Sequence, residues 1–208
     1  MLEIKNLSVR NDDGGSMKDV SVTLQEGEVL AVCGRRVADR SLLLSALVGR
    51  RPLAGGYVSI DGELLTALSA DTFRCEMAFL PRNFRMEEGT VEELFAQMAA
   101  LRSAPDGLNR AMLMEQWKML GIEAGCFGQS FDSLPDSVLQ RVMLSLCGVL
   151  RRRLVVLDDP AWAQDESGGD RVADGIAAMA GGGAMVVVGC DEATWLRHVD
   201  KIVNLNIQ

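Results

Sequence analysis

Several residue types are scarce in this 208-residue sequence, and their scarcity excludes some classes of protein. There is one histidine, and no pair of the five cysteines has the spacing of a zinc-binding motif. An odd number of scattered cysteines also disfavours a disulfide framework. We therefore expect buried, reduced thiols in a cytoplasmic protein, at Cys33, Cys75, Cys126, Cys147 and Cys190.

Long apolar runs and an excess of basic residues are also missing. No uncharged apolar stretch reaches the roughly 20 residues that a membrane-spanning helix needs, so any work at a membrane would depend on another subunit. The formal net charge is -8, whereas nucleic-acid binding needs a face rich in lysine and arginine. We expect no nucleic-acid partner and, since 48% of residues are apolar, one globular domain over residues 1–208.

The hydropathy pattern predicts an α/β fold. Residues 2–7 and 19–24 alternate apolar and polar side chains, as half-buried antiparallel strands do, with a turn at 12–15. Three fully apolar runs predict strands buried on both faces of a parallel sheet, namely Val29–Cys33, Leu154–Leu157 and Met185–Val188.

Helices are predicted between these strands. An amphipathic segment from Ser41 to Val48 follows the first buried strand, and residues 57–62 return to strand and turn. From Thr90 to about Leu120 the spacing of leucine, methionine and alanine predicts helices, with a break at 105–107. The run Arg151–Arg153 is expected to be a solvated helix end, and His198 an ordinary surface or half-buried residue.

Six landmarks follow one another in an order and at a spacing that resemble the ATPase domain of ABC transporters. This resemblance covers nearly the whole chain and implies a P-loop NTPase-like fold: a mostly parallel sheet flanked by helices, an N-terminal antiparallel β part, and a helical lobe over about 82–140. The landmarks are 20–34, 56–62, 79–82, 90–93, 134–142 and 154–160, the last followed by Asp165.

The phosphate loop of that family is altered here. Its pattern, G-x-x-x-x-G-K-[ST], lets backbone N–H groups and the lysine reach phosphates while the hydroxyl binds magnesium. In the corresponding segment, 34–41, only Gly34 and Ser41 are kept, and Arg40 replaces the lysine. Val37 stands where the family uses glycine, and a β-branched residue forced into a glycine conformation costs roughly 1–2 kcal/mol. The loop is expected to take another shape.

Asp39 also stands at a glycine position of this loop. A carboxylate about 4 Å from a phosphate oxygen costs on the order of 4 kcal/mol at an effective dielectric constant of 20. Arg40 could still pair with a phosphate; alternatively, Asp39 pairs with a nearby arginine and the loop closes on itself. We therefore doubt that ATP and magnesium are cofactors of this chain, although Gly34, Arg40 and Ser41 are the residues that would bind the nucleotide.

The resemblance also implies roles in hydrolysis. Asp158, with Ser41, occupies the magnesium position, and Asp159 replaces the glutamate that activates water. Its carboxylate would lie about 1 Å farther back, a displacement that can cost ~100-fold in rate. Cys190 replaces the histidine that holds the γ-phosphate, and a thiol is a poor substitute for the imidazole donor. Asp159 would be catalytic only in an active enzyme.

Two recognition segments differ as well. Arg82 stands at the glutamine-loop position, where the family has a neutral amide that can reach a metal ion. The signature L-S-G-G-Q is replaced over 134–138, with loss of both glycines and gain of Asp136. No aromatic residue lies around 9–11 to stack on adenine.

These changes favour a pseudo-ATPase: an ABC-type subunit with a structural or regulatory role beside a membrane-spanning transporter subunit, contacting it around Arg82–Phe95. It would be cytoplasmic, peripheral on the inner face of the membrane when bound to that partner, and could form a homodimer or a heterodimer with an ABC ATPase. Two alternatives stay open. One is a divergent but working transport ATPase that uses Asp159 as base, and the other is a scaffold or binding protein unrelated to transport.

Overall fold

The computed structural model describes residues 1–10, 16–84 and 88–205, so the expected turn at 12–15 lies outside it. The helices are α1 (Val37–Leu47), α2 (Ala70–Glu76), α3 (Val91–Ala99), α4 (Arg110–Leu120), α5 (Asp136–Val149) and α6 (Glu166–Gly181), with short 3-10 turns η1 (Ala124–Gly128) and η2 (Phe131–Ser133). The strands are β1 (Leu2–Arg10), β2 (Ser16–Leu24), β3 (Val29–Cys33), β4 (Gly55–Ile60), β5 (Glu63–Leu64), β6 (Met77–Leu80), β7 (Leu154–Asp158), β8 (Met185–Cys190) and β9 (Lys201–Asn204).

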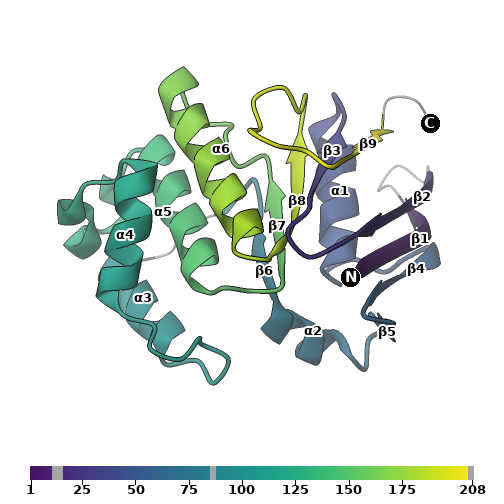
Figure 1. Ribbon diagram of the computed structural model, residues 1–208, viewed down its shortest axis with the longest axis horizontal. Helices are drawn as coiled ribbons and strands as arrows, with labels where there is room; N and C mark the ends of the chain where they lie inside the picture. The colour runs from purple at the N-terminus through teal and green to yellow at the C-terminus, as the bar shows by residue number, and fades with distance from the viewer. Residues whose placement is uncertain (11–15, 85–87, 206–208) are drawn as a thin grey trace.

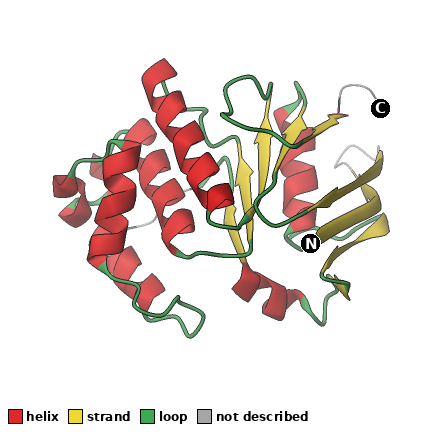
Figure 2. Ribbon diagram, in the orientation of Figure 1, coloured by secondary structure: helices red, strands yellow, loops and turns green. Residues whose placement is uncertain are grey.

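Within the described residues the strands form two sheets (Figures 1 and 2). The first is antiparallel with the order β2-β1-β4-β5, and the second is parallel with the order β6-β7-β8-β3-β9. Helix α1 lies between the two sheets, while α4, α5 and α6 lie on the other side of the parallel sheet (Figure 1). The predicted α/β class, with its N-terminal antiparallel part, is therefore confirmed.

The parallel sheet separates two cores. Successive side chains of a strand point to opposite faces. In β3, Leu30 and Val32 therefore join α1 and the antiparallel sheet, whereas Val29 and Ala31 join the helices of the other side. Strands β7 and β8 divide their side chains in the same way. Burial on both faces explains why these strands are apolar without alternation.

Capping residues fix the ends of the helices α3 and α4, which lie between β6 and β7 in the sequence. Thr90 caps α3 with a capping box that includes Glu93, and Asn109 caps α4 by accepting from the backbone N–H groups of residues 111 and 112. Gly121 ends α4 at a φ of 60°, a conformation that favours glycine. The predicted helical segment from 90 to 120 is thus two helices, separated at the predicted break.

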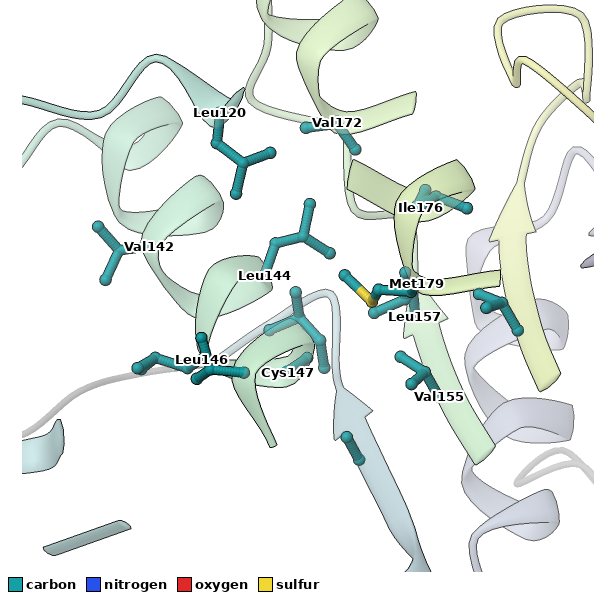
Figure 3. Close-up of a cluster of buried hydrophobic side chains, with 14 of the residues drawn as sticks. Leu120, Val142, Leu144, Leu146, Cys147, Val155, Leu157, Val172, Ile176 and Met179 are labelled. Atoms are coloured by element: carbon teal, nitrogen blue, oxygen red, sulfur yellow. The ribbon is translucent and has the colours of Figure 1, made fainter. Parts of the chain in front are cut away.

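Helices α4, α5 and α6 pack through an apolar cluster. Figure 3 shows Leu144 of α5 pointing toward Leu120 of α4 and toward Ile176 of α6. The Nε1–H of buried Trp117 donates to the Ser145 hydroxyl at 2.9 Å, so the polar edge of the indole is satisfied inside this core. The leucines of these three helices that are buried, such as Leu113 and Leu146, are core residues, Met114 and Met143 pack against the core while partly exposed, and Leu101 after α3 is exposed.

Some local predictions need correction. Helix α1 begins at Val37, four residues before the predicted start. The expectation of five buried thiols is wrong for Cys75, which is exposed, and for Cys126, which is partly exposed, because both lie in short helical segments at the edges of the cores. Across the described residues, each helix is too short or too polar to cross a lipid bilayer.

Candidate functional site

Polar residues gather where the central parallel strands end. Gly34 follows β3, Asp158 is the last residue of β7 with Asp159 next, and Asp191 follows β8. Strands β7, β8 and β3 are neighbours and parallel, so their carboxyl ends share one edge of the sheet. Ligands of open α/β sheets bind at such edges.

Arg40 is the centre of this cluster. Its side chain is fully buried, with 0% of its surface exposed. One terminal nitrogen donates to the carbonyl oxygen of Gly34 and to the carboxylate of Asp191, and the other donates to Oδ2 of Asp159 at 3.1 Å. The guanidinium in the position of the family's lysine therefore faces inward, paired with two carboxylates. We call this arrangement of Arg40, Gly34, Asp159 and Asp191 the arginine latch.

Asp159 is held by a second cation as well. The Nε of Arg82 lies 3.3 Å from its Oδ2, within ion-pair distance though outside hydrogen-bond geometry, and the Arg82 guanidinium stacks 5.7 Å from the ring centroid of Trp162. The backbone of Asp159 has a φ of 53°, a left-handed conformation that aspartate tolerates better than most residues. Burial raises the pKa of Asp159, against the opposing effect of Arg40 and Arg82.

Asp158 and Ser41 form a second contact beside the latch. The Ser41 hydroxyl donates to Oδ2 of Asp158 at 2.6 Å, and Asp158 is 3% exposed. Burial raises the pKa of this carboxyl, while the Ser41 hydrogen bond opposes the shift. Its Oδ1 is buried and makes no hydrogen bond of normal geometry within the described part of the chain. A free buried carboxylate oxygen beside a hydroxyl fits a magnesium ion, which prefers oxygen ligands.

The segment from 34 to 41 is folded back on itself, which is one of the two alternatives that the sequence allowed. Because α1 begins at Val37, the backbone N–H groups of Asp39 and Arg40 both turn to the carbonyl of Arg36, at 3.1 and 3.4 Å. Asp39 pairs with Arg36 at 3.6 Å and lies in the first helical turn, where the helix dipole favours a carboxylate. With no glycine at either altered position, the helix extends into the loop segment.

The signature segment is linked to the same cluster. Helix α5 begins at Asp136, directly after Pro135. One turn later Gln140, only 2% exposed, donates to the backbone carbonyl of Asp159 at 3.2 Å and accepts from Gln164 at 2.8 Å. The start of α5 is therefore tied to the segment that follows β7.

Sequence reasoning placed Gly34, Arg40, Ser41, Asp158 and Asp159 in the site, and the structure brings all five together. It missed Asp191, whose signal is an acidic residue directly after an apolar strand of the same sheet. It also missed the role of Gln140. A single buried glutamine does not show in the hydropathy pattern of a helix, so the sequence gives little indication that this side chain is buried. His198 is exposed and pairs with Asp200 at 2.8 Å, outside the latch.

Comparisons with known proteins agree with this geometry. The family model described as ABC transporter matches residues 17–162. The cytochrome c biogenesis ATP-binding export protein CcmA of Albidiferax ferrireducens is 30% identical over 173 residues, which cover 82% of this chain and 80% of that protein. The Fe(3+) ions import ATP-binding protein FbpC of Streptomyces coelicolor is 25% identical over 205 residues; the match covers 98% of this chain but 58% of that longer protein.

Among solved structures, the chain is similar in fold to a dimeric ATP-binding cassette in a post-hydrolysis state bound to ADP and Pi. The TM-score is 0.81 at 21% identity, and the match covers 98% of this chain and 94% of that one.

Our doubt that ATP and magnesium are cofactors is wrong. The chain matches the ABC transporter family model, and its curated relatives CcmA and FbpC are ATP-binding proteins. The doubt rested on the charge of Asp39 and on the closed loop. The structure does pair Asp39 with Arg36, as one of the two alternatives had it, but this pairing also offsets the charge and draws the carboxylate into the first turn of α1. On the match of residues 17–162 and the similarity to CcmA, the chain belongs to the ABC transporter family, among its ATP-binding proteins.

Proposed function

We propose that this chain binds Mg-ATP but hydrolyses it poorly, and that it serves as a structural or regulatory subunit beside a membrane-spanning transporter subunit. Residues 1–208 would act as one ABC ATPase-like domain. The observation that carries the proposal is the ion pair between Asp159 and the buried Arg40.

ATP binding is supported by the Asp158–Ser41 contact and by the relatives. Asp158 and Ser41 would hold the magnesium ion, and Arg40 with Gly34 would face the phosphates. Magnesium supplies positive charge that neutralises phosphate oxygens. In the latch Arg40 is already paired with carboxylates, so ATP must compete with Asp159 and Asp191 for the guanidinium.

Weak hydrolysis is supported by what surrounds the position of the base. A general base needs a carboxylate that can accept a proton from water at hydrogen-bond distance. In this chain Oδ2 of Asp159 lies 3.1 Å from Arg40 and 3.3 Å from Arg82. Cys190, at the position of the family's histidine, is 1% exposed, and its sulfur contacts Cys33.

Calorimetric ATP titration and an ATPase assay on the native chain and Asp159→Asn test this proposal. We expect the native chain to bind Mg-ATP. We also expect native chain and variant to share the same background turnover, because removing the charge of Asp159 cannot lower the rate if Asp159 does not act as the general base. A native turnover well above that of Asp159→Asn would favour the divergent working ATPase. The double variant Asp159→Glu with Cys190→His should gain turnover.

The transport role needs a separate test. Relatives named for import and export suggest a membrane-spanning partner, which would contact the surface around Arg82 and the start of α3. Co-purification from the native host, with a polytopic membrane protein identified in the complex, is the expected result. Loss of that complex on Arg82→Glu, with the fold intact, would place the contact. Absence of any such complex would favour a scaffold role instead.

A further inference from the structure

Two cysteines meet directly behind the latch. Cys33 is the last residue of β3 and Cys190 the last of β8, and the two are paired in register in neighbouring parallel strands. Their sulfur atoms are 3.9 Å apart. In-register residues of paired strands point to the same face of the sheet, and their Cα atoms lie about 4.8 Å apart, inside the range of about 4.4–6.8 Å that disulfides need.

We propose that Cys33 and Cys190 are a site of reversible oxidation by small disulfides, and that the Cys33–Cys190 disulfide locks the segment that faces the nucleotide. Closing the bond requires the sulfur atoms to approach by about 2 Å, which small rotations and backbone shifts supply. The other three cysteines, which are Cys75 in α2, Cys126 in η1 and Cys147 in α5, are likewise free thiols and lie outside these two strands.

Access and acidity assign different roles to the two thiols. Cys33 is 7% exposed and lines a pocket of about 860 Å³, together with Leu196, Val199 and Ile202. Cys190 is 1% exposed. Burial raises the pKa of both thiols, but the Cys190 thiol and Arg40 hold that of Cys33 down, whereas Cys33 raises that of Cys190 further. Cys33 is therefore the thiol that reacts first.

The reaction balances with one small disulfide, written RSSR. The Cys33 thiolate attacks one sulfur of RSSR, and RS⁻ leaves and takes up the proton that Cys33 lost. The Cys190 thiol then loses its proton and attacks the Cys33 sulfur of the mixed disulfide, and a second RSH leaves. The protein loses two protons and two electrons, and RSSR is reduced to two RSH.

The consequence for the nucleotide site follows from the next residue on each strand. The N–H of Gly34 donates to the carbonyl of Cys190 at 3.3 Å, and the carbonyl of Gly34 accepts from Arg40, which also binds Asp191. A bond between Cys33 and Cys190 fixes Gly34 and Asp191 relative to each other. The latch then opens less readily, and, if the proposed function holds, ATP binds more weakly.

Oxidised glutathione is the probe for the test, on a background of Cys75→Ser and Cys126→Ser that removes the more exposed thiols. We expect peptide mass spectrometry to find Cys33 cross-linked to Cys190, reversed by a reducing agent. In the same background, Cys190→Ser should stop at a stable glutathione adduct on Cys33, and Cys33→Ser should leave Cys190 unmodified. A stable adduct on Cys33 with Cys190 present, or no reaction at either thiol in the folded protein, overturns the proposal.

Two measurements follow the effect of the disulfide on the loop, hydrogen exchange and ATP affinity. Together they distinguish a failure of the proposed lock from a failure of the proposed ATP binding. Hydrogen exchange of residues 34–41 should slow at least threefold on oxidation, with or without nucleotide, and should not respond in Cys33→Ser. ATP affinity of the oxidised protein should fall about fivefold. Unchanged hydrogen exchange in the cross-linked protein contradicts the lock. If the reduced protein binds no ATP, the proposed function fails while the mass and exchange results still decide the disulfide.

Discussion

Two arginines of this chain, at opposite ends of the parallel sheet, each bridge more than one carboxylate, yet they differ in burial. Arg40 lies at the carboxyl end, fully buried, between Asp159 and Asp191. Arg153 lies at the amino end, directly before β7, with 40% of its side chain exposed. It pairs with Asp61 and lies 3.4 Å from Glu26 and 3.3 Å from Glu76.

The comparison teaches that the number of ion pairs says little about their energy. Exposed pairs contribute about 0–1 kcal/mol because water already solvates both charges. A buried pair can contribute little in total, but removal of one partner costs about 3–5 kcal/mol because the remaining charge is stranded. The Arg153 cluster joins the antiparallel sheet, through Asp61 after β4, to the strand β7; the latch instead holds groups that nucleotide chemistry would need.

The largest expected effect is that of Arg40→Ala. The variant removes the cation between Asp159 and Asp191 and leaves a cavity in the site, with Arg82 as the remaining cation beside Asp159. Because Asp191 is 71% exposed and can turn to water, the loss should fall near the lower end of the range for buried pairs, about 3 kcal/mol. Urea unfolding measures this loss. A loss below about 1 kcal/mol would show that the ion pairs of the latch are exposed to water rather than buried.

A smaller effect is expected for Asp191→Asn, which loosens the latch and keeps its shape. The pair between Arg40 and the exposed Asp191 should contribute about 1 kcal/mol, so freeing the guanidinium should raise ATP affinity about fivefold. Calorimetric titration at constant salt measures the change. Glu192→Gln is the matched control, since it removes a neighbouring charge outside the latch. Equal increases in ATP affinity in the two variants would mean that the general negative charge of this surface, and not the Arg40–Asp191 ion pair, opposes ATP binding.

At the amino end, Arg153→Ala should cost less than about 1 kcal/mol of unfolding free energy. Its three carboxylate partners remain solvated, with 64%, 52% and 40% of their side chains exposed for Glu26, Asp61 and Glu76. The urea midpoint, compared directly with that of Arg40→Ala, tests the role of burial. Similar losses for both variants would remove the contrast between the two ends of the sheet.

Sequence reasoning reached the fold because its main signals are local and redundant. The apolar strands at Val29–Cys33, Leu154–Leu157 and Met185–Val188 can only be accommodated with both faces covered, and the order of the landmarks left few topologies. Short elements without a strong period were missed: α2, and the edge strand β9, whose side chains alternate between half-buried and exposed.

The chemistry of the site was harder to predict, because it depends on which charges meet in space. For Asp39 the sequence left two alternatives, repulsion of phosphate or pairing with a nearby arginine, and the structure shows the second, with Arg36 at the N-cap of α1. Arg40 was correctly placed in the site, yet nothing local shows that it turns inward to Asp159 and Asp191, which follow strands far along the chain. Arg153 likewise is not merely a solvated helix end, since its carboxylates come from three separate segments.

The smallest expected effect concerns pH and the exposed cluster. Arg153 and, second, the N-terminal ammonium lower the pKa of Asp61 from 3.8 to about 2. A carboxyl whose pKa is lower in the folded protein stabilises the fold above its unfolded pKa, and this contribution disappears as the pH falls from about 4 toward 2. In Asp61→Asn the urea midpoint should therefore fall less steeply as the pH decreases over that window. Above pH 5 the dependence of the midpoint on pH should be unchanged. Because burial raises the pKa of Asp159 at the other end of the sheet, Asp159→Asn should not reproduce this flattening. The same response in both variants would mean that the exposed and the buried arginine clusters are not electrostatically distinct.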